Sequence, residues 1–296
     1  MNFTKQLFFI PVFSVMCGAH AATPLLGPDL NSQTIYSGAA ITSGAGSMVG
    51  GNIQAIEATT IGAGSEVGIN LVAGAAITLG ASAKVAGDVT AGIVLTLGDS
   101  AMVAGNVQSL TGSITLGANA VAFGTVTAGT SITISASAIA GGATTPGQIS
   151  YDFTHNQRTQ LQQAQVALNN MPISTELATT MSVDTTRQPG VYHAAGLTTT
   201  AGIILTLDGN PLGGDLEPSF WVFNIDSYMA FGANTTIKLL NVHQDSTIIW
   251  NTGSYTTIGP GSNIIGAIIA DSYVTTGAGT TLTGVDNACP MRGALS

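Results

Sequence analysis

The sequence predicts an all-β fold, a triangular parallel β-solenoid of 18-residue coils with one long α-helix packed along it. Three observations predict this fold. Residues 38–146 repeat with a period of 18 residues, each repeat contains short apolar stretches, and one later stretch spaces its apolar residues as a helix does. A fixed period of this kind is typical of a solenoid, because each repeat buries its apolar side against the next one.

The chain opens with the features of a secretory signal peptide, over residues 1–21. A lysine stands near the start, an apolar run covers residues 7–16, and a small-x-small sequence ends at Ala21. The apolar run is too short to span a membrane, and Pro11 interrupts it. We therefore expect no membrane span, cleavage near Ala21, and secretion of residues 22–296 as a single extracellular or periplasmic domain.

The regular repeats form the N-terminal part of this domain, residues 22–150. Six coils begin at Gly38, Ile56, Gly74, Gly92, Thr111 and Gly129, with one inserted residue, Leu110. Positions 4, 6, 12 and 16 of the coil are apolar, so we expect them to face inward from three strands. Glycines at positions 7 and 14 predict corners, where the backbone turns tightly or takes a positive φ. Beyond the second corner we expect a ladder of side chains from Asn52, Asn70, Asp88 and Asn106.

A helix is predicted where the repeat stops, over residues 151–171. Thr154 and Gln157 form a capping box, and Pro172 ends the helix. An apolar stripe fit to lie on one face of the solenoid is formed by Leu161, Ala164 and Leu168. About 16 helical residues span about 24 Å, or about five coils of a solenoid. We therefore expect the helix to carry the chain back to the first coil, so that later strands stack there.

Those later strands lie in the C-terminal part, residues 172–296, and are less regular. Residues 202–207 repeat the first strand of a coil, and residues 220–225 form an aromatic-rich strand that is expected to be buried on both sides. Residues 253–270 form another coil of 18 residues, and residues 271–284 continue it. The same solenoid is therefore expected to continue after the helix.

Position 5 of the coil lies between two inward columns, so its side chain is expected to point outward. The predicted outward column consists of Thr42, Thr60, Thr78, Thr96, Thr115, Thr133, Thr206, Thr257 and Thr275. The flanking outward residues at position 3 include Ala40, Ala58, Ala76, Ser113 and Ser131. Threonines repeating at strand spacing hold hydroxyl and methyl groups at fixed intervals with few rotamers. Such a surface is suited to ordering water into an ice-like array, although threonine also favours exposed strands for purely structural reasons.

Seven short segments, taken together and in order, carry a family resemblance. They are Ile35–Thr42, Gly51–Ile53, Leu161–Ala164, Gly190–Tyr192, Leu205–Gly209, Trp221–Ile225 and Thr256–Ala270. In this order they resemble the bacterial DUF3494 ice-binding protein family, also called antifreeze proteins. The resemblance implies a right-handed, discontinuous β-helix with a helix along its axis, exported and adsorbing to ice to inhibit its growth or recrystallisation.

The sequence departs from this family in two places. Many members insert a capping subdomain among the early coils, whereas the repeats here run through without one. The usual ending Gly-Arg-Ala-Leu-Ala is replaced by the segment Gly284–Cys289. Cys289 is the one thiol left after cleavage near Ala21, so no disulfide within the chain is expected.

Composition and motifs argue against other functions. Only 7% of residues are charged and the net charge is -9, without a basic cluster, so no nucleic-acid partner is expected. Nucleophile-elbow, phosphate-loop and zinc-protease motifs are absent from the sequence. The histidines left after cleavage, His155, His193 and His243, are far apart along it. We therefore expect no enzyme, no catalytic or metal-binding residues and no cofactor, and a monomer whose partner is the ice surface.

One alternative remains open at this point, a structural or adhesive exoprotein that binds matrix or carbohydrate without affinity for ice. Fold resemblance alone does not exclude it. A binder of sugars would expose aromatic side chains, and such a feature is offered by Tyr228, Tyr255 and Tyr273, which share position 3 of the later coils. The faces of the solenoid therefore decide between the two functions.

Overall fold

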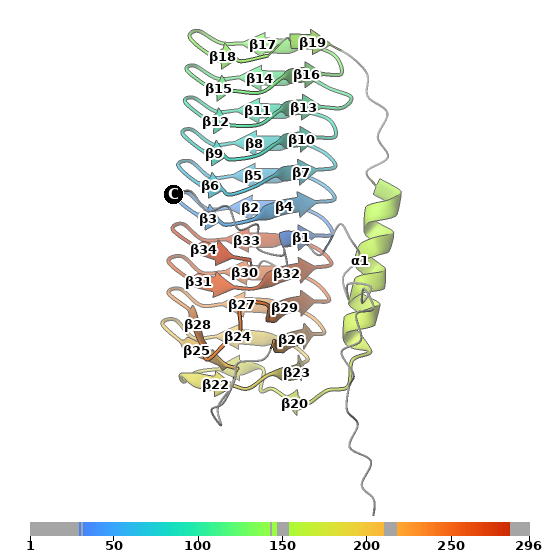
Figure 1. The fold of residues 1–296 in the computed structure, drawn as a ribbon, viewed down its shortest axis with the longest axis vertical. Coiled ribbons are helices and arrows are strands. Elements are labelled where there is room, and N and C mark those ends of the chain that lie inside the picture. Colours follow the sequence, from blue (N-terminus) through green and yellow to red (C-terminus); the bar gives the residue numbers. More distant parts are fainter. Residues whose placement is uncertain (1–29, 31, 143, 147–153, 210–217, 285–296) are drawn as a thin grey trace, which may run out of the picture.

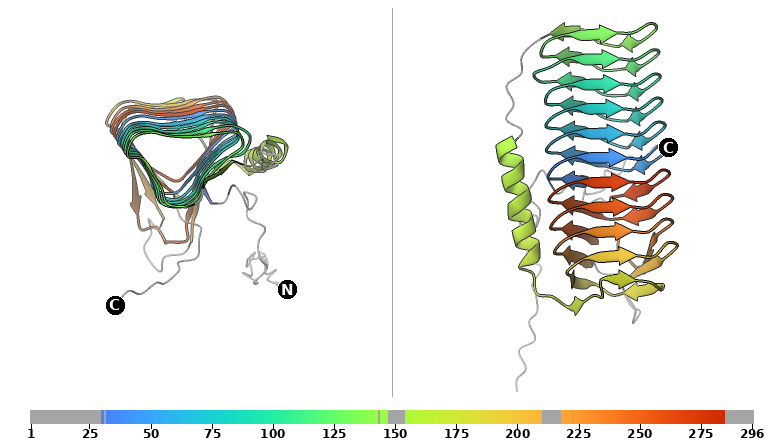
Figure 2. Two further views of the ribbon diagram at one scale, coloured as in Figure 1. Left: turned by 90° about the horizontal axis from the view of Figure 1, so that it is seen from above. Right: turned by 180° about the vertical axis from the view of Figure 1, so that it is seen from behind.

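A computed structural model describes residues 30, 32–142, 144–146, 154–209 and 218–284 of the chain. The predicted signal peptide, residues 1–21, and Cys289 lie outside the described residues. Three parallel sheets, of 12, 11 and 11 strands, form the sides of a triangular solenoid beside one helix (Figures 1 and 2). The predicted fold class is confirmed.

The first sheet, here sheet A, lies on the side of the helix. It contains β1 (Gln33–Ser37), β4 (Asn52–Ala55), β7 (Leu71–Ala73), β10 (Val89–Ala91), β13 (Val107–Ser109), β16 (Val126–Ala128), β19 (Thr144–Pro146), β20 (Thr175–Glu176), β23 (Gly190–Ala194), β26 (Phe220–Ile225), β29 (Thr247–Thr252) and β32 (Ala267–Ala270).

Sheet B contains the strands at positions 4 to 6 of the coils and the C-terminal strands stacked in line with them. Its strands are β2 (Ile41–Ser43), β5 (Thr59–Ile61), β8 (Ile77–Leu79), β11 (Leu95–Leu97), β14 (Ile114–Leu116), β17 (Ile132–Ile134), β21 (Thr180–Met181), β24 (Leu197–Thr199), β27 (Met229–Phe231), β30 (Thr256–Ile258) and β33 (Val274–Thr276).

Sheet C completes the triangle. Its strands are β3 (Met48–Val49), β6 (Glu66–Val67), β9 (Lys84–Val85), β12 (Met102–Val103), β15 (Val121–Ala122), β18 (Ile139–Ala140), β22 (Thr185–Arg187), β25 (Ile204–Asp208), β28 (Thr236–Leu240), β31 (Asn263–Ile265) and β34 (Thr281–Thr283).

The two halves of the solenoid meet at a seam between coils that are far apart in sequence. The first three strands, β1 to β3, pair with the last three described strands, β32 to β34. We predicted that later strands would stack on the first coil, and they do, but it is the last of them that pairs there (Figure 1). Coils add in one direction along the axis, so the chain has to restart at the far end, with β20, before it can finish on the first coil.

The apolar columns form one continuous core inside the triangle. Residues at the predicted inward positions, such as Leu71, Ile77, Leu79 and Leu95, have no exposed surface. In the C-terminal coils three aromatic rings stack inside the core, with Phe223 lying 5.0 Å from Tyr192 and 4.1 Å from Trp250 between ring centroids. Burying each large apolar side chain contributes about 1.5–3 kcal/mol, so this core supplies much of the folding free energy.

The predicted corners at positions 7 and 14 lie between strands of different sheets, but the glycines at position 7 do not have a positive φ. Left-handed backbone occurs at position 9 of the coil, for example at Gly46 with φ 66° and Ser82 with φ 57°. Glycine is needed at position 7 for another reason, since a Cβ at Gly62 would lie 2.5 Å from the carbonyl carbon of Gly44 in the preceding coil. These glycines are required because the coils approach each other closely at that corner.

The predicted ladder beyond the second corner is confirmed. Each side-chain oxygen accepts a hydrogen bond from the backbone N–H one coil further on. Asn70 N donates to Asn52 Oδ1 at 3.0 Å, Asp88 N to Asn70 Oδ1 at 2.8 Å, and Asn106 N to Asp88 Oδ1 at 2.6 Å. The ladder therefore satisfies corner N–H groups that lie outside the sheets.

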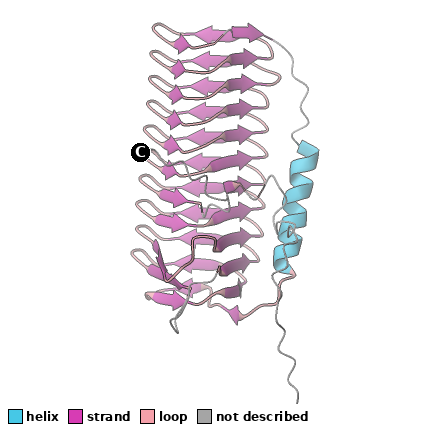
Figure 3. Cartoon of the chain, viewed as in Figure 1, coloured by secondary structure: helices cyan, strands magenta, loops and turns pink. Residues whose placement is uncertain are grey.

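Helix α1 (Thr154–Asn169) lies against the outer face of sheet A and is the one helix among the described residues (Figure 3). Its predicted stripe is buried in a second apolar cluster with Tyr36, Val222 and Ile249. Polar contacts hold it too, because Asn224 Nδ2 donates to the carbonyl oxygen of Leu168 at 2.6 Å. The side chain of the predicted cap, Thr154, lies outside the described part of the structure.

The described part of the chain contains no helix long and apolar enough to cross a membrane.

Candidate functional site

Sheet B presents one outward residue from each of its 11 strands, aligned along the whole solenoid. Strand pairing places them in this order: Thr133, Thr115, Thr96, Thr78, Thr60, Thr42, Thr275, Thr257, Ala230, Thr198 and Thr180. We call this column the threonine row. It crosses the seam without a shift of register, since Thr42 pairs with Thr275. All its members are partly or fully exposed.

Eight of the nine threonines predicted from the sequence lie in this row, and Thr206 does not. Thr206 lies on β25 in sheet C, where its neighbours are Thr186 and Lys238. The prediction failed because a Leu-Thr-Leu segment has the same alternation in any sheet, and the irregular C-terminal spacing gave no coil position. Thr198 and Thr180 were not predicted, for the same reason.

A second line of outward residues, the flanking row, runs beside the threonine row at position 3. Backbone hydrogen bonds between coils connect Ser131, Ser113, Val94, Ala76, Ala58, Ala40, Tyr273, Tyr255 and Tyr228 in that order. The predicted residues Ala40, Ala58, Ala76, Ser113 and Ser131 are therefore all together, beside six threonines. Neither row contains a charged residue.

The side chains of the threonine row are well suited to a fixed surface. Threonine is branched at Cβ, so its χ1 angle has few rotamers, and each strand is hydrogen-bonded on both sides except at the ends of the sheet. Neighbouring strands lie about 4.8 Å apart. On the other side of the row the glycines of position 7 add no side chain. The face is therefore flat, uncharged and regular along the N-terminal coils.

The other two faces are less regular. Sheet C carries an ion pair between Lys84 Nζ and Glu66 Oε1 at 2.9 Å, beside the exposed methionines Met48 and Met102. Sheet A is covered by α1 across its C-terminal strands, while its N-terminal strands expose mixed residues such as Val72, Thr90 and Gln108. The sequence predicts a helix on one face of the solenoid, and in the structure it covers part of sheet A.

Comparison with known proteins identifies the family of the chain. The family described as Ice-binding-like matches residues 122–289, which is more than half of the chain. The chain belongs to the Ice-binding-like family. No curated protein matches the sequence.

Solved structures of ice-binding proteins are similar to this Ice-binding-like protein. One is from the Antarctic ascomycete Antarctomyces psychrotrophicus, with 16% identity, a TM-score of 0.46, and coverage of 88% of this chain and 97% of that one. Another is the DUF3494 domain of ice-binding protein 1 from Shewanella frigidimarina, with 19% identity, a TM-score of 0.46, and coverage of 87% and 95%. A third, from an Antarctic bacterium of the Flavobacteriaceae, has 12% identity, a TM-score of 0.37, and coverage of 88% and 98%.

Two histidines of this Ice-binding-like protein, His193 and His243, lie outside sheet B, each next to a carboxylate. His193 Nδ1 lies 2.8 Å from Glu176 Oε2, and its Nε2 lies 2.9 Å from Asp226 Oδ1. His243 faces Asp245 at 3.5 Å. Among the described residues, no three His, Cys, Asp or Glu side chains form a group able to hold a metal ion.

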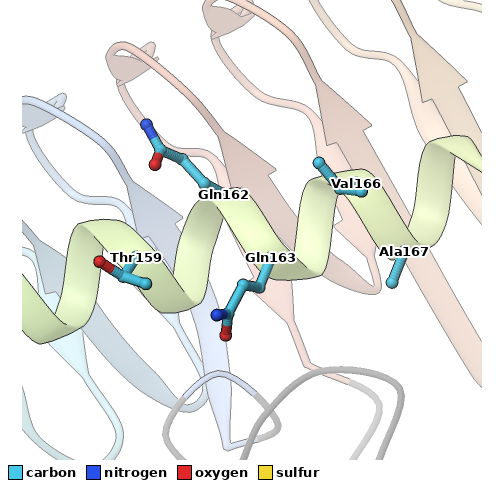
Figure 4. Close-up of a pocket in the computed structure, with 5 residues that line it drawn as sticks. All are labelled: Thr159, Gln162, Gln163, Val166 and Ala167. Carbon is cyan, nitrogen blue, oxygen red and sulfur yellow. The ribbon is translucent and has the colours of Figure 1, made fainter.

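A shallow hollow lies along the helix, away from sheet B. Figure 4 shows the residues that line it, Thr159, Gln162, Gln163, Val166 and Ala167. None of them is an acid or a base, so the hollow offers no pair of groups for proton transfer. Membership of the Ice-binding-like family likewise favours a protein that binds and does not catalyse.

Proposed function

We propose that this protein binds the surface of ice crystals through the threonine row and the small residues beside it, and thereby slows crystal growth or recrystallisation. The observation that carries the proposal is the run of eight threonines, from Thr133 to Thr257, on consecutive strands of one uncharged face. Family membership supports ice as the partner.

The chemistry of such a face explains the binding. Each hydroxyl donates hydrogen bonds to water and accepts them from it, whereas each methyl group forms no hydrogen bond. Because the hydroxyls repeat at strand spacing on a rigid sheet, the water bound to them is already positioned and loses little further freedom on joining a crystal. A charged side chain would instead hold water in its own hydration shell, and the face has none.

Substitution of one central threonine tests the proposal. We expect Thr78→Tyr to lower thermal hysteresis and the fraction recovered by ice-affinity partitioning by about tenfold, because a bulky ring at the centre keeps ice away from its neighbours. Thr90→Tyr is the matched control, since Thr90 is an outward threonine of the same coil on sheet A. It should leave both measurements nearly unchanged.

Three outcomes of this experiment are informative. Loss of activity in Thr78→Tyr alone supports the threonine row. Loss in Thr90→Tyr alone would move the site to sheet A. Exclusion of the folded wild-type protein from ice would overturn the function itself.

The adhesive alternative is disfavoured by the arrangement of the tyrosines. Sugars stack on the faces of aromatic rings, whereas Tyr228, Tyr255 and Tyr273 stack on one another, with centroids 5.7 and 4.9 Å apart. Their faces are therefore largely occupied by each other.

We further propose that the protein is exported after removal of residues 1–21 and acts as a monomer. The mass of the secreted chain tests the cleavage, and its elution on size exclusion tests the oligomeric state.

A further inference from the structure

The flanking row changes character at the seam. On the N-terminal side it consists of alanine, serine and one valine, and on the C-terminal side it becomes Tyr273, Tyr255 and Tyr228. The three rings form a tyrosine ladder with interplanar angles of 4° and 16°. Val274 N donates to the carbonyl oxygen of Ala40, so Tyr273 is the direct neighbour of the alanine segment. One face thus contains two different surfaces.

The tyrosine ladder is fixed in place. Tyr255 has a ring on each side, and at the far end Tyr228 packs over Gly196, where an added Cβ would lie 3.1 Å from its Cε1 atom. Parallel stacking gains from contact between the rings and restricts their rotation. The rings therefore cannot turn aside to admit a flat partner as isolated exposed tyrosines would.

The ladder removes the flatness that ice requires. In the N-terminal coils, alanine and serine beside the threonine row are no longer than threonine itself. A tyrosine at the same position carries a ring and hydroxyl beyond its Cβ, and Tyr273 is 39% exposed. An ice plane resting on these rings would be held away from Thr257 and Thr275. The single break in the threonine row, Ala230, also lies on a ladder coil, two residues after Tyr228.

We propose that ice contact is confined to the six N-terminal strands of sheet B, β2, β5, β8, β11, β14 and β17, and that the tyrosine ladder is the boundary of the contact surface. This inference rests on the proposed function. The C-terminal part of the threonine row then stabilises the sheet without touching ice. The structure assigns to the tyrosines the role of limiting the size of the ice-binding surface.

Equal substitutions on the two sides of the boundary test this inference. Thr78→Tyr is expected to lower thermal hysteresis by about tenfold, while Thr257→Tyr, in the same row beside Tyr255, changes it by less than about twofold. Circular dichroism and thermal unfolding confirm that both variants are folded. An equal loss in both variants would overturn the boundary and leave the proposed function intact. Full activity in both would overturn the proposed function.

Removal of the tyrosine ladder tests the same inference by an expected gain of activity. The triple variant Tyr228→Ala, Tyr255→Ala, Tyr273→Ala extends the flat surface past the seam, so thermal hysteresis is expected to rise at equal protein concentration. An unchanged or lower value in the folded variant would overturn the inference, because the rings would then be neutral or part of the ice contact. If the triple variant does not fold, Tyr273→Ala alone, next to the seam, is expected to raise thermal hysteresis by a smaller amount. An unchanged or lower value in this variant would likewise overturn the inference.

Discussion

At the scale of the residue, His193 is the side chain whose chemistry depends most on its neighbours. Hydrogen bonds that the protonated imidazole donates to Glu176 and to Asp226 raise the pKa of His193 above its ordinary value of 6.5, although burial acts to lower it. The three side chains come from successive coils, on or beside β20, β23 and β26. The protonated imidazole therefore connects the end coil to the body of the solenoid.

This arrangement predicts a loss of stability as pH rises. Because the pKa is raised in the folded state, the stabilisation is fully present below about 6.5, the unfolded value, and disappears as pH rises through the raised pKa. We expect the difference in Tm between the wild type and His193→Gln to be largest near pH 5.5 and to shrink toward pH 8.5. Differential scanning calorimetry at several pH values measures it.

The control for this prediction is Glu176→Gln, which keeps the size of the side chain but removes its charge. It should reduce the pH dependence without abolishing it, because Asp226 remains on the other side of the ring. A Tm difference that is constant with pH would mean that His193 acts by packing alone. Since both groups are partly exposed, high salt should weaken the effect.

Single residues also show the limit of sequence reasoning about the site. In the N-terminal coils the strict period located Thr42 to Thr133 and the flanking alanines correctly. In the C-terminal coils strands lengthen and loops intervene, so alternation still identified outward threonines but no longer identified their sheet. Thr206 was therefore placed in the wrong sheet, and Thr198 was overlooked.

At the scale of the element, α1 is stabilised by its packing on sheet A. It has no acidic residue in its first turn and no basic residue in its last turn, so its macrodipole gains nothing from charged side chains. Leu161 and Leu168 are completely buried, and Gln165 Nε2 donates to the carbonyl oxygen of Thr252 at 2.9 Å. The sequence predicted the helix and its apolar stripe, because helical spacing is a local property. It did not reveal which sheet the stripe would cover.

Two substitutions within the helix test this dependence on packing. Leu168→Ala removes a fully buried side chain and should lower the free energy of unfolding by about 2–4 kcal/mol. Val166→Ala is the matched control, because Val166 is 61% exposed on the same helix, and its effect should stay below about 0.5 kcal/mol. Urea unfolding followed by circular dichroism measures both.

The same pair of variants separates stability from activity. Helix α1 lies on sheet A, whereas the threonine row lies on sheet B, so thermal hysteresis near 0 °C should be retained by both variants while they remain folded. Equal destabilisation by both would contradict the packing role of the stripe. Loss of thermal hysteresis in a folded Leu168→Ala variant would mean that the helix contributes to the ice-binding face.

At the scale of the whole molecule, the seam decides whether the two halves behave as one solenoid. Solenoid coils contact only their neighbours, so the sheets couple the halves through the pairing of β1–β3 with β32–β34, and α1 adds contacts with both halves. The core here is partly polar, and Ser47 Oγ donates to the carbonyl oxygen of Gly277 at 3.0 Å. The strands paired at the seam are more than 200 residues apart in sequence, and such non-local pairing is expected to slow folding.

The order of coils at the seam was beyond sequence reasoning. The helix length predicted that the chain returns past several coils, and the coil-like segment at residues 253–270 predicted further stacking. The pairing of the last coil with the first, however, depends on the direction in which coils accumulate along the axis. That direction is a property of the whole chain, which no local pattern encodes.

A pair of glycines on the first coil provides a direct test of the seam. A Cβ at Gly38 would collide with the backbone carbonyl group of Asp271 in the last coil, whereas a Cβ at Gly50 would make an ordinary contact of 3.5 Å with the carbonyl oxygen of Leu282. Neither glycine has a positive φ. We therefore expect Gly38→Ala to cost about 1–3 kcal/mol of unfolding free energy, and Gly50→Ala to be nearly neutral.

Urea unfolding followed by two signals measures how strongly the two halves of the solenoid are coupled. Both tryptophans, Trp221 and Trp250, lie in the C-terminal half, so their fluorescence follows that half, while circular dichroism follows the whole solenoid. In the wild type the two signals should change together on urea unfolding, because the seam joins the halves. In Gly38→Ala we expect the two transitions to separate. Coincident transitions in that variant would mean that contacts other than the seam, above all those of α1, suffice to hold the halves together.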